Sequence, residues 1–247
     1  MSAWRELRWW LLLLPALPLI LPLALHTRRH ALRLAPAAGP AQGLAGAQLS
    51  GEPFRLLVLG ESTVAGVGVS CLQHALAGCL AQALSERFGR PVAWRACGEN
   101  GITAAQACER LLPRALDDSP ELALLVFGVN DSTGLTSLRR WQLALGLMTE
   151  ALKARGARVA FSAVPPLQHF HALPWLLRTL LGARAALLDA RLRRLAGQTA
   201  ADYCAVSLPF SSRYLALDGY HPSGLGYRVW AQGVAERLTL PAIPAAG

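Results

Sequence analysis

Five short apolar runs alternate with longer amphipathic stretches, and this alternation limits the possible folds more than any other feature of the chain. The apolar runs span residues 55–59, 92–97, 122–127, 158–164 and 203–206. The stretches with helical spacing span residues 71–88, 103–116, 138–155, 183–197 and 222–238. A continuous apolar run is typical of a strand buried on both faces, and strand–helix alternation requires right-handed crossovers. The sequence therefore predicts an α/β fold whose five strands form an open parallel sheet with helices on both faces.

Residues that can carry chemistry follow the first three predicted strands, and others precede the last predicted helix. Ser62 comes after the first strand, Gly101 after the second and Asn130 after the third, while Asp218 and His221 precede the last helix. Open parallel sheets bind ligands at the carboxyl ends of their strands, so these residues are expected to meet at one edge. Each of these segments also has a purely structural interpretation. Serine caps helices, glycine and asparagine close turns, and the proline after His221 can open the last helix.

Taken together, the five residues match the requirements of nucleophilic acyl transfer. His221 can accept the proton of the Ser62 hydroxyl, and Asp218, three residues earlier, can hold the other imidazole nitrogen and fix its tautomer. The N–H groups of Ser62 and Gly101 and the side-chain amide of Asn130 can stabilise the oxygen that becomes negative. Such a reaction requires no metal and no organic cofactor, so we expect neither.

With these residues, the chain resembles the SGNH hydrolases, also called GDSL esterases and lipases, over roughly residues 55–238. The resemblance implies a flavodoxin-like three-layer αβα sandwich. It also implies Ser62 as nucleophile, His221 as general base and Asp218 as the acid that orients it. The implied oxyanion donors are the Ser62 amide, Gly101 and Asn130.

The sequence departs from that family at Glu61, because the usual Gly-Asp-Ser is here Gly-Glu-Ser and a longer carboxylate must fit beside the nucleophile. An α/β-hydrolase is excluded by spacing, since Val64 stands where the second glycine of G-x-S-x-G would be. We expect an esterase that forms an acyl-enzyme intermediate. Alternatives within the family are a carbohydrate O-acetylesterase, a thioesterase and a lysophospholipase. The alternative from another class is a catalytically silent, membrane-tethered binding protein.

The N-terminal segment differs in composition from the rest of the chain, because residues 9–25 are uncharged and consist almost entirely of Leu, Pro, Ala and Ile. This length is at the lower limit for a membrane span, and Pro15, Pro18 and Pro22 each remove a helical hydrogen bond. A cleavable signal peptide is the alternative. Small residues at cleavage spacing occur only beyond a basic segment, which favours an uncleaved membrane anchor.

Composition divides the chain into four parts. Residues 1–33 form the predicted anchor. Residues 34–52 are rich in Ala, Gly and Pro without periodicity, which predicts a flexible linker. Residues 53–240 form the predicted esterase domain, and residues 241–247 a tail.

Charge and cysteine content narrow the partners and the location. The formal net charge is +9, and an arginine-rich surface can bind anionic lipid or nucleic acid. Nucleic-acid binding would need a basic stripe with interleaved aromatic residues, but the arginine clusters are short and separated, so nucleic acid is not expected as a partner. Five cysteines without CxxC spacing favour a reducing compartment, and hence the cytoplasmic side. Arginines on both sides of the apolar segment do not determine its orientation. Nothing in the sequence indicates the oligomeric state.

The connection after the fourth strand, residues 164–182, is longer than connections in such sheets usually are. It is rich in leucine and has no acidic residue. One interpretation is a cap that completes the core; the other is an acyl-binding wall in which Trp175 and Leu176 contact a small-molecule or lipid ester substrate. The second favours esters of short to medium acyl chains. His169 and His171 have no evident third ligand, so a solvated loop is expected there and not a metal site.

Overall fold

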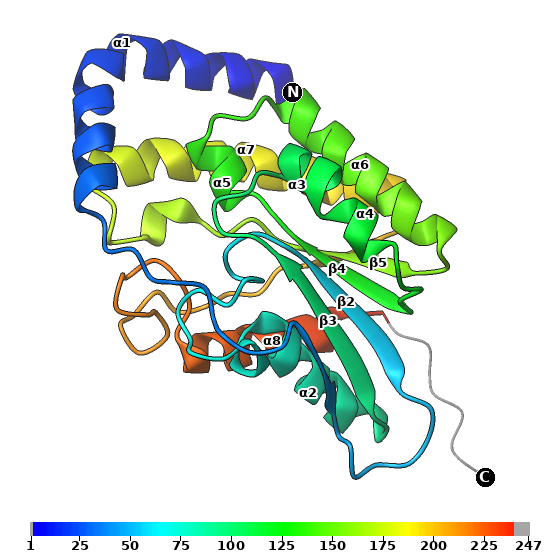
Figure 1. Cartoon of the computed structure of the whole chain (residues 1–247). Helices are drawn as coiled ribbons and strands as arrows, with labels where there is room; N and C mark the ends of the chain where they lie inside the picture. Colours follow the sequence, from blue (N-terminus) through cyan, green and yellow to red (C-terminus); the bar gives the residue numbers. More distant parts are fainter. Residues whose placement is uncertain (1, 240–247) are drawn as a thin grey trace.

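A six-stranded sheet forms the centre of the structure, a computed structural model that describes residues 2–239 (Figure 1). In order of pairing, the strands are β1 (Gln42–Ala45), β3 (Val92–Gly98), β2 (Phe54–Gly60), β4 (Leu122–Val126), β5 (Arg158–Ser162) and β6 (Asp202–Cys204). Strands β2 to β6 are parallel, whereas β1 pairs antiparallel with β3. The predicted α/β fold with five parallel strands is confirmed, and each predicted strand boundary lies within two residues of the observed one.

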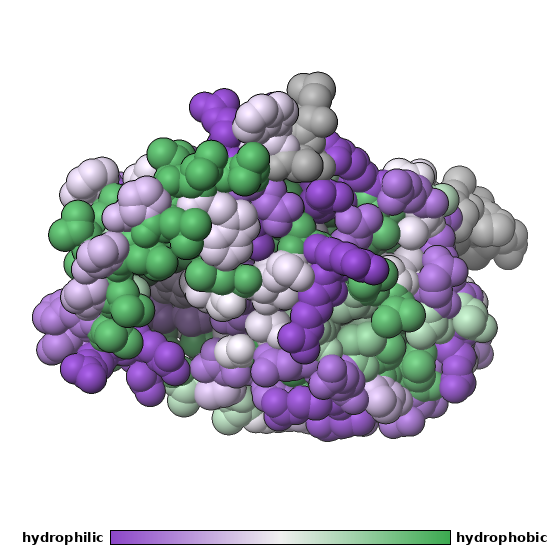
Figure 2. All heavy atoms as spheres, turned by 90° about the horizontal axis from the view of Figure 1, so that it is seen from above, coloured by the Kyte–Doolittle hydropathy of each residue, from purple (hydrophilic) through white to green (hydrophobic). Residues whose placement is uncertain are grey.

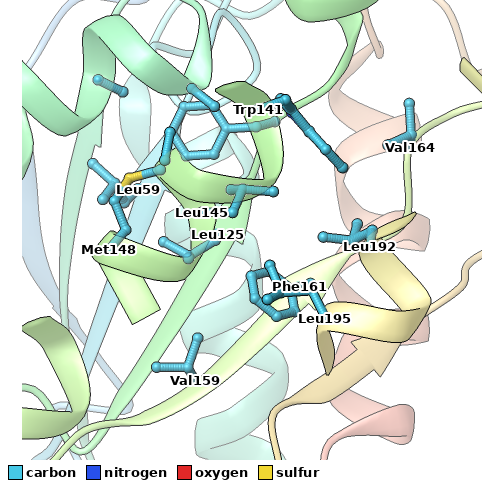
Figure 3. Packing of buried hydrophobic residues seen from close by; sticks show 14 of the residues in the cluster. Leu59, Leu125, Trp141, Leu145, Met148, Val159, Phe161, Val164, Leu192 and Leu195 are labelled. Carbon is cyan, nitrogen blue, oxygen red and sulfur yellow. The ribbon is translucent and has the colours of Figure 1, made fainter. Parts of the chain in front are cut away.

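Helices cover both faces of the sheet (Figure 1). One face carries α3 (Ala104–Arg110), α4 (Leu112–Ala115), α6 (Leu138–Ala154) and α7 (Trp175–Gln198), and the other carries α2 (Leu76–Phe88) and α8 (Gly224–Arg237). Alternate residues of β2 serve the two layers, since Leu57 and Leu59 join the first cluster while Leu56 and Val58 join the second. Figure 3 shows the first cluster, where Leu145 of α6 lies with Leu125 of β4.

The expected flexible linker contains ordered structure, and this part of the prediction is wrong. Within residues 34–52, β1 pairs with the edge strand β3 in the register Gln42↔Arg95 to Ala45↔Val92. Ala38 forms a further bridge with Cys71. A strand at the sheet edge obtains its hydrogen bonds from its neighbour, so β1 forms with only one of its residues, Ala45, buried.

The long connection predicted after the fourth strand is also shorter than expected. Helix α7 begins at Trp175 and runs for 24 residues, so residues 175–182 belong to the helix. The remaining connection contains the 3₁₀ turn η2 (Leu167–His169), which packs against α7. Leu167 and Phe170 in this connection are buried in the core, as the cap interpretation requires.

Near the N-terminus, helix α1 (Ser2–His30) bends into two arms and lies against α7 (Figure 1). Among the described residues it is the one helix long and apolar enough to cross a membrane, judged by length and composition. Such a helix near the N-terminus fits either a membrane anchor or a signal sequence.

Candidate active site

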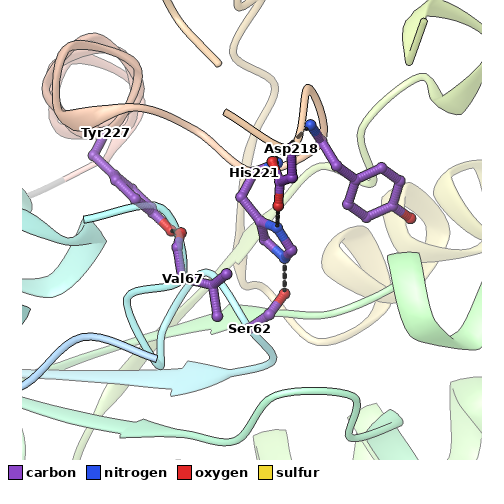
Figure 4. A network of polar contacts seen from close by, with 6 residues as sticks. Ser62, Val67, Asp218, His221 and Tyr227 are labelled. Carbon is purple, nitrogen blue, oxygen red and sulfur yellow. Dashed lines mark hydrogen bonds and ion pairs between the residues drawn. The ribbon is translucent and has the colours of Figure 1, made fainter. Parts of the chain in front are cut away.

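Ser62 follows the end of the central strand β2 and is nearly buried. The turn after it approaches the segment that carries His221 very closely: a Cβ on Gly68, whose φ is +105°, would lie 2.3 Å from the Pro222 carbonyl oxygen. Tyr227 of α8 donates a hydrogen bond of 2.6 Å to the Val67 carbonyl, which ties this turn to α8 (Figure 4). The turn after Ser62 and the segment that carries His221 are therefore held against each other.

Ser62, His221 and Asp218 form a continuous chain of hydrogen bonds (Figure 4). His221 Nε2 lies 3.0 Å from Ser62 Oγ, and His221 Nδ1 lies 2.6 Å from Asp218 Oδ2. Because the Asp218 carboxylate can only accept, Nδ1 carries the proton and Nε2 is left to accept from the serine hydroxyl. This geometry allows a proton to pass from Ser62 to His221.

Asp218 is held as a carboxylate by its surroundings. Its Oδ1 accepts hydrogen bonds of 3.0 Å from the N–H groups of Tyr220 and His221. Burial by itself would raise the pKa of Asp218, but the hydrogen bonds from the His221 ring and from these two N–H groups lower the pKa below its usual value. The carboxylate is therefore ionised at neutral pH and can fix the imidazole.

Gly101 and Asn130 follow β3 and β4, the two strands on either side of β2, so both lie at the same sheet edge as Ser62. Gly101 has a φ of +82° and open space where a Cβ would be. Asn130 lies in the short helix α5 (Val129–Thr133), and its Nδ2 donates 3.1 Å to the Ile102 carbonyl. One amide hydrogen of Asn130 remains for another acceptor.

Glu61 fits beside Ser62 because its side chain points into the protein, and only 3% of its surface is exposed. Oε1 accepts 3.0 Å from the Val129 N–H, and Oε2 accepts 2.8 Å from the Asn130 N–H. Burial raises the pKa of Glu61 to about 8, although these two N–H groups act in the opposite direction. The longer side chain of Glu61 thus connects the turn at Ser62 to the start of α5.

A second buried carboxylate, Asp131, connects the neighbouring loops. Its Oδ2 accepts 3.0 Å from the Ala104 N–H, at the start of α3 and three residues after Gly101. Burial raises the pKa of Asp131 to about 6, against the lowering effect of the Ala104 N–H. Sequence reasoning missed this residue and Tyr227. The acidic residue directly after Asn130 at a strand end was the available signal for Asp131, whereas nothing in its helical pattern distinguishes Tyr227.

A cavity of about 630 Å³ opens beside Ser62 and His221. Its apolar wall comes from β4, the segment after β5 and the segment after β6, and includes Phe127, Val164, Phe170 and Phe210. Residues of α7 complete one side, and there the carboxylate of Asp189 accepts 2.7 Å from the Tyr203 hydroxyl and 3.0 Å from Arg193 Nε.

Trp175 and Leu176, expected as an acyl-binding wall, do not line this cavity. Trp175 is 69% exposed at the start of α7, and Leu176 packs with α1. The expectation is wrong because α7 begins earlier than predicted, so both residues lie in its first turn, where Leu176 packs with α1 and not against the cavity.

His169 and His171 both line the cavity, and their side chains contact an aromatic ring and a guanidinium group, neither of which is a metal ligand. His169 stacks on Phe210 with ring centroids 5.6 Å apart, and His171 Nδ1 lies 2.7 Å from Arg178 Nη1. Across the part of the chain that the structure describes, no three His, Cys, Asp or Glu residues come together in a way that could hold a metal ion.

Comparison with known proteins identifies the family. A model of the GDSL-like lipase/acylhydrolase family matches residues 58–229. A GDSL-like esterase of Mycobacterium tuberculosis is 26% identical over 213 residues, and the match covers 76% of this chain and 66% of that relative, just under two thirds of its length. The chain belongs to the GDSL-like lipase/acylhydrolase family, whose members are hydrolases that act on esters.

Solved structures have the same fold. TesA matches with a TM-score of 0.61 and 21% identity, over 75% of this chain and 98% of its own. The psychrotrophic esterase EstA from Pseudoalteromonas sp. has a TM-score of 0.59 and 17% identity, over 74% and 95%. AlinE4, an SGNH-hydrolase family esterase, has a TM-score of 0.51 and 24% identity, over 62% and 76%. The fold implied by the sequence resemblance is therefore confirmed.

The buried Glu61 carboxyl predicts a specific pH dependence of stability. Its pKa rises from 4.5 to about 8 on folding, so the folded state binds this proton more tightly than the unfolded state. The resulting stabilisation is complete below pH 4.5 and is lost as the pH rises through about 8. In Glu61→Gln, which imitates the protonated form, the free energy of unfolding should therefore rise relative to wild type between about pH 5 and pH 8.

Urea unfolding across that pH range measures this difference directly. Glu52→Gln, at an exposed position before β2, is the matched control and should follow wild type at every pH. Parallel curves for wild type and Glu61→Gln would contradict the raised pKa.

Proposed function

We propose that the protein is a serine esterase in which Ser62 is the nucleophile, His221 the general base and Asp218 the residue that orients His221. The observation that carries this proposal is the 3.0 Å contact between Ser62 Oγ and His221 Nε2, with Asp218 on the opposite ring nitrogen. A catalytically silent binding protein would have no need to keep a serine, a histidine and an ionised aspartate in this order and geometry.

The reaction proceeds in two halves. Ser62 Oγ attacks the ester carbonyl carbon while its proton moves to His221 Nε2, and the carbonyl oxygen becomes negative. His221 returns that proton to the departing alcohol as the ester C–O bond breaks, which leaves an acyl-enzyme. A water molecule then attacks the acyl carbon while one of its protons moves to His221 Nε2. The bond between the acyl carbon and Ser62 Oγ breaks as His221 passes that proton to Oγ, which releases the carboxylic acid and restores the Ser62 hydroxyl.

The amide of Asn130 and the N–H groups of Ser62 and Gly101 would hold the negative oxygen in both halves. Support comes from the open space at Gly101, which lets a substrate approach its amide, and from the second Asn130 amide hydrogen, which Ile102 does not use. Donors fixed in advance stabilise the transition state without reorganisation.

The cavity supports carboxylic esters of short to medium acyl chain as substrates. The apolar surface beside Ser62 is formed by Phe127, Val164, Phe170 and Phe210. Transfer of an acyl chain from water onto this surface would stabilise the bound substrate. A carbohydrate O-acetylesterase, a thioesterase and a lysophospholipase remain the alternatives within the family. We further propose that α1 holds the protein at a membrane, with the domain on the cytoplasmic side.

The nucleophile is tested by Ser62→Ala in the full chain. Wild type should hydrolyse p-nitrophenyl butyrate and react with a fluorophosphonate probe, whereas Ser62→Ala should lose the labelling and roughly 10³-fold or more of the rate. Ser211→Ala, at an exposed position, is the control and should behave as wild type. Absence of labelling in folded wild type would favour the binding protein, and equal turnover by Ser62→Ala would remove Ser62 from the mechanism.

Asn130→Ala tests the oxyanion hole. The lost hydrogen bond forms mainly in the transition state, so kcat should fall by roughly 10²–10³ while KM changes little. Steady-state kinetics with p-nitrophenyl butyrate measure both constants, and circular dichroism checks that the fold is retained. An effect on KM alone would make Asn130 a substrate-binding residue.

A series of p-nitrophenyl esters from acetate to decanoate tests the acyl preference. If the aromatic wall binds the chain, kcat/KM should rise above acetate by up to roughly fourfold for each buried methylene and then level off. Phe210→Ala should flatten this profile, whereas Trp175→Ala, outside the cavity, should leave it unchanged. Best activity on acetate in all three proteins would favour a carbohydrate acetylesterase.

A further inference from the structure

Helix α1 leaves most of its apolar surface uncovered by protein. Only 11% of its most apolar window is buried, and nine of its large apolar residues are exposed, Leu19 the most at 72%. Figure 2, in which α1 faces the viewer, shows hydrophobic surface gathered along it. A contiguous apolar surface of this kind indicates a partner that is itself apolar.

The same helix is attached to the domain by specific contacts with α7. Trp9 Nε1 donates a hydrogen bond of 3.0 Å to the Leu180 carbonyl, and Trp9, Leu13 and Ile20 form a buried cluster with Leu177. A helix that only tethered the domain would not need to bury these residues.

Arg184 of α7 strengthens this attachment. Its side chain is fully buried. The guanidinium carbon lies 5.0 Å from the Trp9 ring centroid, and Nη1 lies 3.8 Å from a carboxylate oxygen of Glu6. Its Nη2 also donates 2.6 Å to the Thr136 carbonyl, which links α1 through α7 to the loop after α5. A desolvated cation against an aromatic face is a favourable contact that removal of α1 would break.

The prolines of α1 argue against a straight membrane span. Pro15, Pro18 and Pro22 lie inside the helix, so its longest proline-free stretch is residues 2–14. Thirteen residues of helix measure ~20 Å, whereas the hydrocarbon core of a bilayer is ~30 Å thick. The helix bends into two arms, as Figure 1 shows, and proline is a common cause of such a bend.

Two further large apolar residues, Trp175 and Leu217, are exposed outside α1. Trp175, exposed at the start of α7, is followed by Leu176, which packs with α1. Leu217 is 91% exposed next to Asp218, and a Cβ on Gly219 would lie only 3.5 Å from Ala172. The loop of Asp218 and the segment just before α7 are therefore neighbours, and His171 in that segment lines the cavity.

We propose that α1 does not cross the membrane but lies in one leaflet while docked on α7, so that the cavity entrance beside Trp175 and Leu217 faces the bilayer surface. Lipid then covers the exposed leucines, and the arginines at both ends of the helix contact anionic headgroups of the same leaflet. This arrangement also explains why the positive charges on its two sides are balanced, since a helix in one leaflet needs no charge asymmetry.

Labelling of the full chain on sealed phosphatidylcholine–phosphatidylglycerol vesicles tests the position of α1. Arg5→Cys should react with a membrane-impermeant maleimide equally with and without detergent, because both ends of α1 face the same solution. Leu12→Cys, on the exposed apolar surface, should react only after detergent is added. Peptide mapping by mass spectrometry separates these sites from the native cysteines. Protection of Arg5→Cys until detergent is added would show that the helix spans the bilayer. Reaction of Leu12→Cys without detergent, or failure of the protein to bind vesicles, would show that lipid does not cover α1. Each of these results would overturn the proposal.

A second experiment tests the docking on α7 and rests on the proposed esterase activity. Trp9→Ala should bind vesicles and hydrolyse p-nitrophenyl butyrate as wild type does, but lose tenfold or more in the hydrolysis of a fluorogenic phospholipid ester carried in the vesicles. Trp4→Ala, exposed on the same helix, is the matched control and should retain both activities. Equal loss in both variants, or in neither, would overturn the docking. If wild type hydrolyses neither ester, the proposed function fails, while the labelling result still decides the position of α1.

Discussion

Two hydrogen bonds from backbone N–H groups to the Glu61 carboxylate connect the parts of the site that come from different strands. Glu61 directly precedes Ser62. Its two carboxyl oxygens accept hydrogen bonds of 3.0 Å from the Val129 N–H and 2.8 Å from the Asn130 N–H. These bonds fix the first turn of α5 relative to Ser62. A buried carboxyl group is costly without hydrogen-bond partners, and here the free N–H groups at a helix start supply them.

Asp131 extends this connection to the third strand. It follows Asn130 directly and accepts the Ala104 N–H of α3, so the loops after β2, β3 and β4 are joined through two buried carboxylates. His221 is held by different contacts, namely those with Asp218, and Tyr227 of α8 holds the turn after Ser62. The proposed proton-transfer side of the site and the proposed oxyanion side are thus supported by opposite helix layers of the sheet.

The sequence was sufficient where a residue's position depends on the strand pattern. Ser62, Gly101 and Asn130 follow strands that are neighbours in the sheet, so the apolar runs alone predicted that they would meet, and the family match confirms the overall assignment of fold and class. The roles of these residues in catalysis stay predictions. The position of Glu61 could not be predicted, because its partners are backbone N–H groups that have no sequence signal of their own.

Two elements differ from the sequence interpretation, β1 and the start of α7, and each depends on contacts with a neighbouring element. Strand β1 buries only Ala45 and depends on the free edge of β3, so its own residues have no strand periodicity. Helix α7 started earlier than expected for a related reason. Its first turns carry Leu177 toward α1, whereas its later turns carry Leu188 and Leu192 into the sheet cluster, so no single apolar stripe runs along it.

Because its packing partners change along its length, α7 connects three parts of the structure. Its N-terminal turns contact α1, its middle lines the cavity through Ala186 and Asp189, and its later turns are anchored in the core. One rigid element therefore spans the distance from the apolar N-terminal segment to the site of Ser62. Because Arg184 is buried between these regions and bonds to Thr136, the position of α1 is set by the same helix that forms one wall of the cavity.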